Sequence, residues 1–215
     1  MGTRHLICVF YNGRFVVAQY GQWDGDQQGA RLVKFLRMPD NIQRLKDGLS
    51  HTYEASEEET VAAEKQLNEL PVFESWDFAD WTQDTTKKLP SNLCPSLCAS
   101  TGAAILEVIS RAEAERKVPI SLELSFANDG LFCEFAFVVD LDKEVLEVFI
   151  GCEKKTPNHR FGDVGENDNT VPSFISSFTF SKLQSMRSEE EFVSQVNKDM
   201  VSVLAIAQSS TVLTS

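Results

Sequence analysis

The sequence lacks any long apolar run and any secretion signal. None of its hydrophobic stretches approaches the ~18 consecutive apolar residues needed to cross a bilayer. Residues 1–6 lack the apolar core of a signal peptide, and Leu6 occupies the position where myristoylation requires Ser or Thr. We therefore expect a soluble cytoplasmic protein with no membrane partner.

Positive charge is also scarce. The chain has 20 Lys and Arg against 32 Asp and Glu, which gives a formal net charge of −12. Its densest basic groups are single pairs, Lys87-Lys88 and Lys154-Lys155. Proteins that bind nucleic acids gather Lys and Arg into a patch that contacts phosphates. Because the basic residues here are scattered, we expect no nucleic-acid partner.

Patterns of metal-binding residues are missing as well. The three histidines are far apart, and the cysteines are an odd number, five: Cys8, Cys94, Cys98, Cys133 and Cys152. Cys94 and Cys98 form a C-x3-C pair, whereas zinc ribbons use C-x2-C pairs. Thiols in the cytoplasm stay reduced. We therefore expect no metal, no cofactor and no disulfide.

The sequence does contain a clear hairpin signal near its start. Two apolar runs, 5–11 and 14–20, flank Asn12-Gly13. Asn-Gly between such runs favours a two-residue turn of type I′. Successive positions in both runs are apolar, so both faces of these strands should be covered by other parts of the chain.

Further helices and strands are predicted along the chain. Apolar spacing and capping signals indicate helices at 30–37, from Asp40, after Ser56, at 100–117 and from Ser188 to about Ala207. Strands are expected at 120–126, 131–139 and 144–150, which would form an antiparallel meander, and at 172–180.

This order of elements predicts an α+β fold. A mainly antiparallel sheet, made of the N-terminal hairpin and the three-strand meander, would be covered by helices. An αββα sandwich is one form that the pattern allows. No internal repeat and no linker is visible, so we expect one domain over residues 1–207 followed by a frayed tail at 208–215.

A polar loop after the second predicted strand holds the densest group of candidate binding residues. It contains Gln19, Gln22, Trp23 and Asp24, and it leads into a helix through Gln28-Gly29. Glycines allow sharp turns, and a helix start offers free N–H groups. The loop has no phosphate-binding G-x4-G-K-[ST] motif. It is either a site for a small polar ligand or a solvated turn.

Glu134 is a second candidate, because it interrupts the apolar run 131–139. A carboxylate inside a central strand must be ion-paired, hydrogen-bonded or protonated. Such a group can serve as a general acid or base. The alternative is a structural ion pair with Arg4 or Arg160. Asp140 and Asp142 are most simply interpreted as turn residues.

Thr3 stands just ahead of a predicted strand–turn–strand unit, as the nucleophile does in N-terminal-nucleophile hydrolases. In those enzymes, cleavage before the hydroxyl residue frees an amine that acts as the base. Lys34 would be the electrostatic partner. Two features oppose this hypothesis: the chain retains residues 1–2, and Gln19 stands about where a proteasome-like site would use Asp.

Three segments resemble a family of uncharacterised proteins of fungi, bacteria and phages. They are Gly2-Thr3-Arg4, the AQYGQWDG block at 18–25 and the stretch from Cys133-Glu134 to Asp140. The resemblance covers about residues 1–40 and 97–161 and implies no particular activity. The chain departs from the family in reading DQQG at 26–29 and Cys98-Ala99-Ser100 before the predicted long helix.

Three functional interpretations remain open. The first is a domain that binds a small molecule or a protein partner through these residues: Arg4, Gln19, Gln22, Trp23, Asp24, Glu134 and Arg160. The second is a metal-independent hydrolase or transferase of the N-terminal-nucleophile type, with Glu134 or Asp24 as acid or base. The third is a structural or homo-oligomerisation domain. Binding is favoured because the sequence reveals no nucleophile–base pair.

Overall fold

The computed structural model describes residues 3–69, 95–165 and 170–212. The strands are β1 His5–Tyr11, β2 Arg14–Gly21, β3 Thr52–Glu54, β4 Val118–Ile120, β5 Phe135–Asp140, β6 Val145–Ile150, β7 Glu153–Lys154, β8 Thr170–Val171 and β9 Phe174–Thr179. The α-helices are α1 Gly25–Leu36, α2 Pro39–Leu49, α3 Glu57–Glu69, α5 Ile105–Ile109, α6 Phe180–Ser185 and α7 Glu189–Val212. Short 3-10 helices are η1 Pro95–Leu97, η2 Gly102–Ala104 and η3 Leu124–Asn128.

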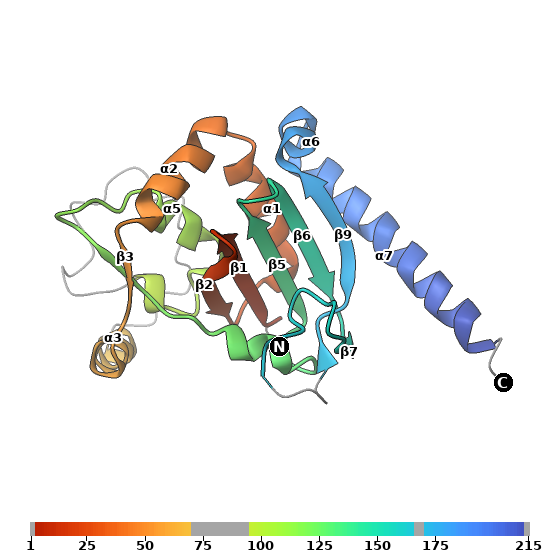
Figure 1. The fold of residues 1–215 in the computed structure, drawn as a ribbon, viewed down its shortest axis with the longest axis horizontal. Helices are drawn as coiled ribbons and strands as arrows, with labels where there is room; N and C mark the ends of the chain where they lie inside the picture. Colours follow the sequence, from red (N-terminus) through yellow and green to blue (C-terminus); the bar gives the residue numbers. More distant parts are fainter. Residues whose placement is uncertain (1–2, 70–94, 166–169, 213–215) are drawn as a thin grey trace.

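A five-stranded sheet in the order β2-β1-β5-β6-β9 lies at the centre of the fold (Figure 1). β1 and β5 run parallel, and the other neighbouring strands are antiparallel. The prediction of an α+β fold with a mainly antiparallel sheet is confirmed. The remaining strands of the described ranges form two-stranded ladders, β3–β4 and β7–β8. These ranges therefore contain no αββα sandwich.

The predicted hairpin is present with the predicted turn. Asn12 and Gly13 have φ angles of 53° and 75°, and positive φ at both central residues defines type I′. Fully buried side chains on β1 point to both faces of the sheet. Ile7 and Val9 join the core under the helices, whereas Leu6 and Cys8 join a separate core on the opposite face. The apolar character of both faces is explained by these two cores.

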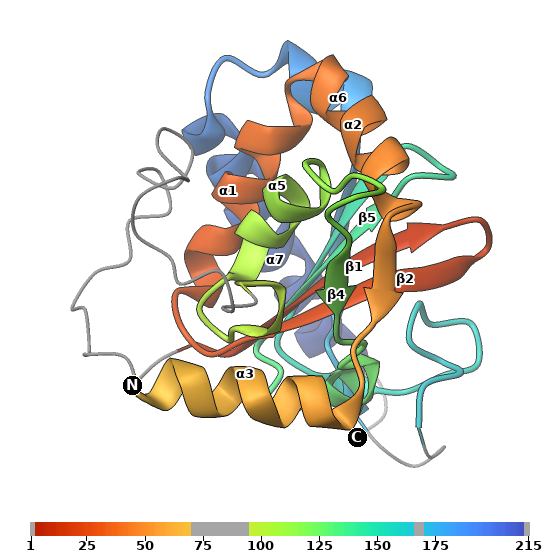
Figure 2. The ribbon, with the colours of Figure 1, turned by 90° about the vertical axis from the view of Figure 1, so that its left-hand side faces the viewer.

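Helices and loops cover opposite faces of the sheet. In Figure 2 the sheet is seen nearly edge-on, with α1, α5 and α7 on one side and the segment between β6 and β9 on the other. We call the second side the loop face. Its core contains Phe149 from β6 and Phe161 from the covering loop, both almost completely buried.

The expected strand at 120–126 is wrong. The regular strand is Val118–Ile120, which pairs in parallel with β3 outside the main sheet, and Leu122 adds a single bridge to Ala18 of β2. Residues 124–128 form η3, which places Phe126 against the loop-face core. The position beside β5 is occupied by β1, and of the alternating apolar residues Leu122 stays exposed while Leu124 and Phe126 are half-buried. The third strand of the antiparallel meander is β9, which pairs with β6.

The expected long helix at 100–117 is also wrong. Gly102 has a left-handed φ of 48°, and the regular helix that follows extends only over Ile105–Ile109. The buried side chain of Gln28 accepts a hydrogen bond from the Ala103 N–H, 2.8 Å away. The apolar pattern predicted the buried face of α5, but this local geometry interrupts the helix.

The remaining helix predictions agree better with the structure. Ser56 and Glu59 form the predicted capping box, with hydrogen bonds in both directions between each backbone N–H and the other side chain. α1 begins at Gly25, five residues before the predicted start at residue 30, so the second half of the predicted polar loop is helical. α7 continues to Val212, past the expected end at Ala207. Within the described ranges, no helix is long and apolar enough to cross a membrane.

Gly48 provides a test of how α2 packs on α5. A Cβ atom at this position would lie 1.9 Å from the Ile109 carbonyl oxygen. Gly→Ala normally stabilises a helix interior by about 1 kcal/mol. Here we expect Gly48→Ala to lower the free energy of unfolding by about 1–3 kcal/mol, because the backbone must move apart. Urea denaturation would measure the change.

Gln43→Ala is the matched control, since Gln43 lies on the same helix and makes only an exposed hydrogen bond to Asp47. It should change the free energy of unfolding by less than about 0.5 kcal/mol. A Gly48→Ala protein that is as stable as the wild type would contradict the described α2–α5 contact.

Candidate functional site

A groove of about 940 Å³ lies on the loop face of the sheet. Its walls come from the tip of the β1–β2 hairpin, from β6 and from residues 156–164, with η3 and β9 at the margins. Phenylalanine rings border part of it, and charged side chains approach from the hairpin tip, the β5–β6 turn, β6 and the loop. Concave sites of this size with a few convergent polar groups are typical of ligand-binding sites.

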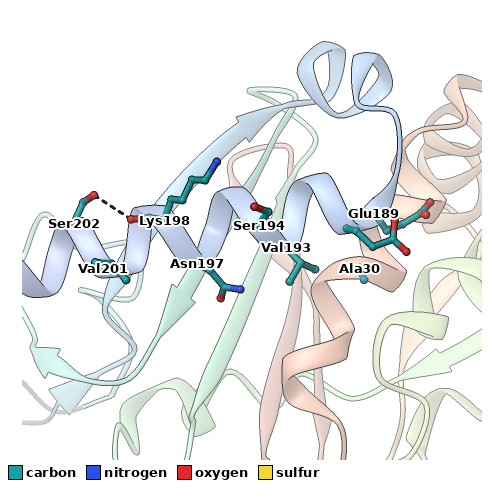
Figure 3. Close-up of a pocket in the computed structure, with 9 residues that line it drawn as sticks. Ala30, Glu189, Val193, Ser194, Asn197, Lys198, Val201 and Ser202 are labelled. Atoms are coloured by element: carbon teal, nitrogen blue, oxygen red, sulfur yellow. Dashed lines mark hydrogen bonds between the residues drawn. The ribbon is translucent and has the colours of Figure 1, made fainter.

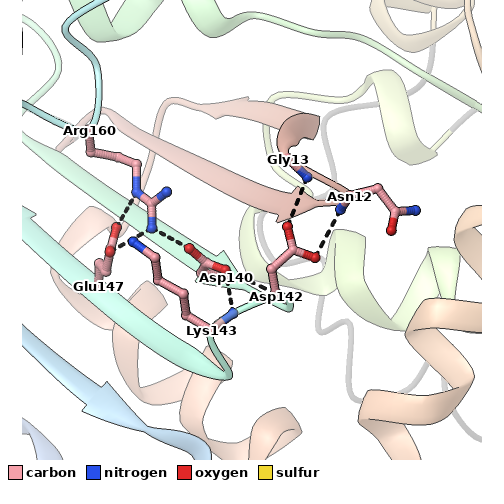
Figure 4. Close-up of polar contacts among 7 residues, drawn as sticks. All are labelled: Asn12, Gly13, Asp140, Asp142, Lys143, Glu147 and Arg160. Carbon is pink, nitrogen blue, oxygen red and sulfur yellow. Dashed lines mark hydrogen bonds and ion pairs between the residues drawn. The ribbon is translucent and has the colours of Figure 1, made fainter.

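Arg160 lies in the groove with two carboxylates beside it. Its Nε donates to Glu147 Oε2 at 2.5 Å, and its Nη2 donates to Glu147 Oε1 at 2.6 Å and to Asp140 Oδ2 (Figure 4). The Asp140 side chain is fully buried, and the side chains of Arg160 and Glu147 are each 13% exposed. The guanidinium is therefore held in one orientation by two fixed ion pairs.

Strand register explains why one arginine reaches both acids. Asp140 pairs with Val145 across β5 and β6, so Glu147 is its diagonal neighbour on the same face of the sheet. The guanidinium also lies 4.8 Å from the centre of the Phe10 ring on β1. Burial lowers the pKa of Arg160, but the hydrogen bonds that it donates to Glu147 and Asp140 outweigh this effect, and the pKa is raised. Arg160 stays charged.

The acidic residues at and just after the end of β5 also hydrogen-bond to the β5–β6 turn and to the β1–β2 turn. Asp140 Oδ1 accepts hydrogen bonds from the backbone N–H groups of Asp142 and Lys143, at 3.1 and 2.8 Å. The Asp142 carboxylate accepts from the Asn12 and Gly13 N–H groups, both at 2.9 Å (Figure 4). The Gly13 and Asn12 bonds lower the pKa of Asp142. Asp142 is thus a turn residue, as predicted, whereas Asp140 is the last residue of β5, and its side chain both accepts from the turn and pairs with Arg160.

One guanidinium nitrogen of Arg160, Nη1, is not used in these ion pairs. Nε and Nη2 use their N–H groups on the two carboxylates, whereas Nη1 has no hydrogen-bond partner among the described residues. Figure 4 shows Nη1 directed away from both acids. An arginine that is already oriented but retains two free N–H groups is a suitable anchor for a ligand acceptor.

Aromatic rings line part of the groove and pack beneath it. The Phe15 and Phe161 rings are stacked 5.8 Å apart, and Phe149 meets Phe174 edge to face at 5.5 Å. Phe149 is buried, while Phe174 is 44% exposed at the rim. His159 packs against Phe149, and burial lowers its pKa. Because its Nδ1 accepts from the Phe161 N–H, the neutral ring carries its proton on Nε2, 3.2 Å from Glu153.

The loop wall is fastened to the body of the protein. Lys155 is 6% exposed, and its ammonium group donates to Asn128 Oδ1 at 3.1 Å and to the Val164 carbonyl at 2.7 Å. These bonds join the two ends of the wall to η3. The loop wall is therefore anchored near both of its ends.

The predicted site residues do not form one site. Arg4 and Glu134 meet at the start of β5, where the Arg4 N–H donates to Glu134 Oε1 at 3.1 Å. Arg160 lies at the other end of that strand, roughly 17 Å away at about 3.3 Å per residue. Glu134 precedes the strand and is exposed, so its predicted place inside a central strand is wrong. The pairing of β1 with β5 begins only at Phe135.

Several polar side chains at the end of β2 and just after it already have partners within the protein. The Gln19 amide donates to the Tyr20 and Cys98 carbonyls, both at 3.0 Å, and Gln19 is only 6% exposed. Asp24 is exposed and lies 3.7 Å from Arg31. Gln22 and Trp23 are also exposed. These residues join β2 and α1 to residues 98–103, and Trp23 alone offers a large free apolar surface there.

The geometry around Thr3 differs from that of an N-terminal nucleophile site. Its hydroxyl accepts a hydrogen bond from the Gly25 N–H at 2.7 Å. Lys34 is exposed on α1, about 13 Å along the helix axis from Gly25. Residues 1–2 lie outside the described ranges.

Sequence reasoning missed Glu147 and the role of Asp140. Glu147 was part of a predicted strand, and its charge within VLEVFI was the available signal. An acidic residue in the middle of an apolar strand, followed by an arginine in the next loop, indicates an ion pair across that face. Among the described residues, no three His, Cys, Asp or Glu side chains gather as a metal site would require; Cys94 lies outside them.

A second hollow of about 810 Å³ follows one side of α7 (Figure 3). It is bordered by successive turns of this helix, including Val193, Asn197 and Val201, with Ala30 contributed by α1. No buried polar side chain lies within it. The groove at Arg160 combines aromatic walls with an oriented charged group, and it is the better candidate site.

Arg160→Met should strongly destabilise the protein, because it leaves the buried Asp140 carboxylate without its cation. Removing one partner of a buried ion pair costs about 3–5 kcal/mol. We expect a loss of this size in the free energy of unfolding, measured by urea denaturation at pH 7. Arg14→Met, an exposed arginine at the rim, is the control and should change little. Equal stability of Arg160→Met and the wild type would contradict the buried network.

His5, at the start of β1, predicts a pH dependence of stability. It is 1% exposed, and burial lowers its pKa from 6.5 to about 4, against an opposing effect of the Thr3 backbone. The unfolded chain binds a proton between these two values while the folded protein does not. Stability is therefore complete above pH 6.5 and is lost as the pH falls toward 4.

Between pH 8 and pH 5 the wild type should lose about 2 kcal/mol more than His5→Leu. Urea denaturation of both proteins across this range would measure the difference, which isolates His5 from other titrating groups. Parallel pH profiles for the two proteins would show that His5 is not buried in its neutral form.

Comparisons with models of protein families, with curated proteins and with solved structures found no match. The resemblance based on the AQYGQWDG block therefore stays a prediction. The chemistry of this chain has to be argued from the arrangement of its own residues.

Proposed function

We propose that the protein binds a small organic ligand in the groove at Arg160. The observation that carries this proposal is the oriented guanidinium, which is fixed by Asp140 and Glu147 while Nη1 stays unused among the described residues. A purely structural ion pair needs no open hollow beside it. Here the pair borders about 940 Å³ of accessible space with aromatic walls.

Rigidity of the groove supports a binding function. The hairpin tip is held by Asp142, and the loop wall is held by Lys155. Binding to such a site costs little ordering of side chains, because they are already in place. This favours a small ligand over a long flexible segment.

The enzymatic alternative has less geometric support. Glu134 is exposed and accepts a hydrogen bond from the Arg4 backbone, and Asp24 is exposed beside Arg31. In the groove, both carboxylates near Arg160 are engaged with it, and His159 makes its contacts with Phe161 and Glu153. A general base must lie within hydrogen-bond reach of the substrate proton that it removes, and these groups are directed toward their present partners.

Residues 19–29, which span the end of β2 and the first turns of α1, remain the alternative location for binding. Trp23 is 53% exposed there, and the Arg4 guanidinium lies 4.6 Å from the centre of the exposed Phe132 ring. Exposed Trp and Arg side chains often carry the energy of protein–protein interfaces. A protein partner or a second copy of the chain would bind at this end of the sheet, far from the groove.

A fragment screen followed by amide NMR spectra tests the proposed function and its location. We expect small aromatic fragments to shift the amide signals of residues 10–15 and 156–164. Thr156→Trp places a large ring at the exposed rim of the groove and should abolish these shifts without loss of stability. Trp23→Ala is the control and should leave them unchanged.

Two outcomes would contradict the proposal. Fragments that shift residues 22–29 and lose binding in Trp23→Ala would move the site to the polar loop. A screen in which no fragment shifts the groove residues would remove the ligand-binding function itself.

A further inference from the structure

The charges around the groove are balanced, and this limits the ligand that it can take. Three cations, Arg14, Lys143 and Arg160, border the groove together with the acids Glu147 and Asp163. Asp140 lies buried directly beneath, in contact with Arg160. Counted together, the three positive and three negative side chains cancel. These six side chains therefore give the groove no excess of either charge.

From this balance we propose that the ligand is a neutral, flat aromatic compound with a carbonyl acceptor, of the aromatic amide or lactam class. The inference rests on the proposed function, because it specifies the occupant of the same groove. Arg160 Nη1 supplies two N–H groups, which match a carbonyl oxygen. The rings of Phe10, Phe15 and Phe174 supply the apolar surfaces that a flat ring contacts.

An anionic ligand fits this anchor poorly. A carboxylate on Nη1 would approach Glu147 and Asp140, which already neutralise the guanidinium. In a partly buried site such like-charge contacts are weakly screened. The neighbouring cations Arg14 and Lys143 lie at the exposed rim, where salt screens them.

A cationic ligand also fits poorly. Nη1 can only donate hydrogen bonds, and a ligand ammonium group has no acceptor function. The carboxylate oxygens of Asp140 and Glu147 are bonded to Arg160 or to backbone N–H groups, and the Asp163 carboxylate lies exposed to water at the rim. A neutral carbonyl can accept from Nη1 without adding charge.

Three probes of nearly the same shape test the charge preference: benzamide, benzoate and benzylammonium. Each would be titrated into the full-length protein while the amide signals of residues 156–164 and the Arg160 Nε–H signal are followed. We expect benzamide to bind at least about tenfold more tightly than either charged probe. Raising NaCl from 50 to 500 mM should leave its affinity unchanged, because no ion pair forms.

Glu147→Gln is the matched variant. It removes one negative charge while Asp140 still pairs with Arg160, so the anchor gains net positive charge. The ratio of benzoate to benzamide affinity should then rise at least about tenfold over that of the wild type. The salt dependence and charge series of the wild type provide the test if this variant does not fold.

The possible failures are distinguishable. If benzoate or benzylammonium binds best and shifts the groove signals, the ligand class is wrong while the groove remains a binding site. An unchanged affinity ratio in a folded Glu147→Gln protein also overturns the ligand class. If none of the three probes shifts a groove signal, both the ligand class and the proposed function fail.

Discussion

The ion pairs of Arg160 with Asp140 and Glu147 determine the architecture of the loop face. Asp140 is fully buried at the end of a central strand, where an unpaired carboxylate would be costly. Arg160 neutralises it and carries the 156–164 loop over the sheet. Phe161, the next residue, then enters the loop-face core. The pairing of Arg160 with the buried Asp140 thus places the 156–164 loop over the sheet. This loop brings Phe161 into the loop-face core and forms one wall of the groove.

The two ends of the sheet use polar side chains in different ways. Near the start of β1, Gln19 and Gln28 satisfy backbone groups of residues 98–103 and hold separate segments together. At the other end, Arg160 retains unused donors beside open space. The dense polar residues of the sequence therefore lie where separate segments of the fold are joined, while the best binding geometry comes from three charged residues on two consecutive strands and the loop that follows them.

The parts of the fold that depend on neighbouring residues could be predicted. The Asn12-Gly13 turn and the Ser56–Glu59 capping box follow from local chemistry, and the apolar strands indicated an α+β fold. The strand at 120–126 and the helix at 100–117 were wrong because β1 takes the place beside β5, and Gln28 holds Gly102 and Ala103 from a distance. The Arg160 network depends on the register of β5 with β6, which no local pattern reveals.

The guanidinium signals of Arg160 in the free protein test this account most directly. ¹⁵N-detected NMR resolves the individual N–H groups of an arginine when rotation of its guanidinium is slow. The structure predicts slowly exchanging Nε and Nη2 protons, held by Glu147 and Asp140, and rapidly exchanging protons on the open Nη1. A single averaged signal with rapid exchange at every nitrogen would mean that Arg160 is not fixed, and it would contradict the described site.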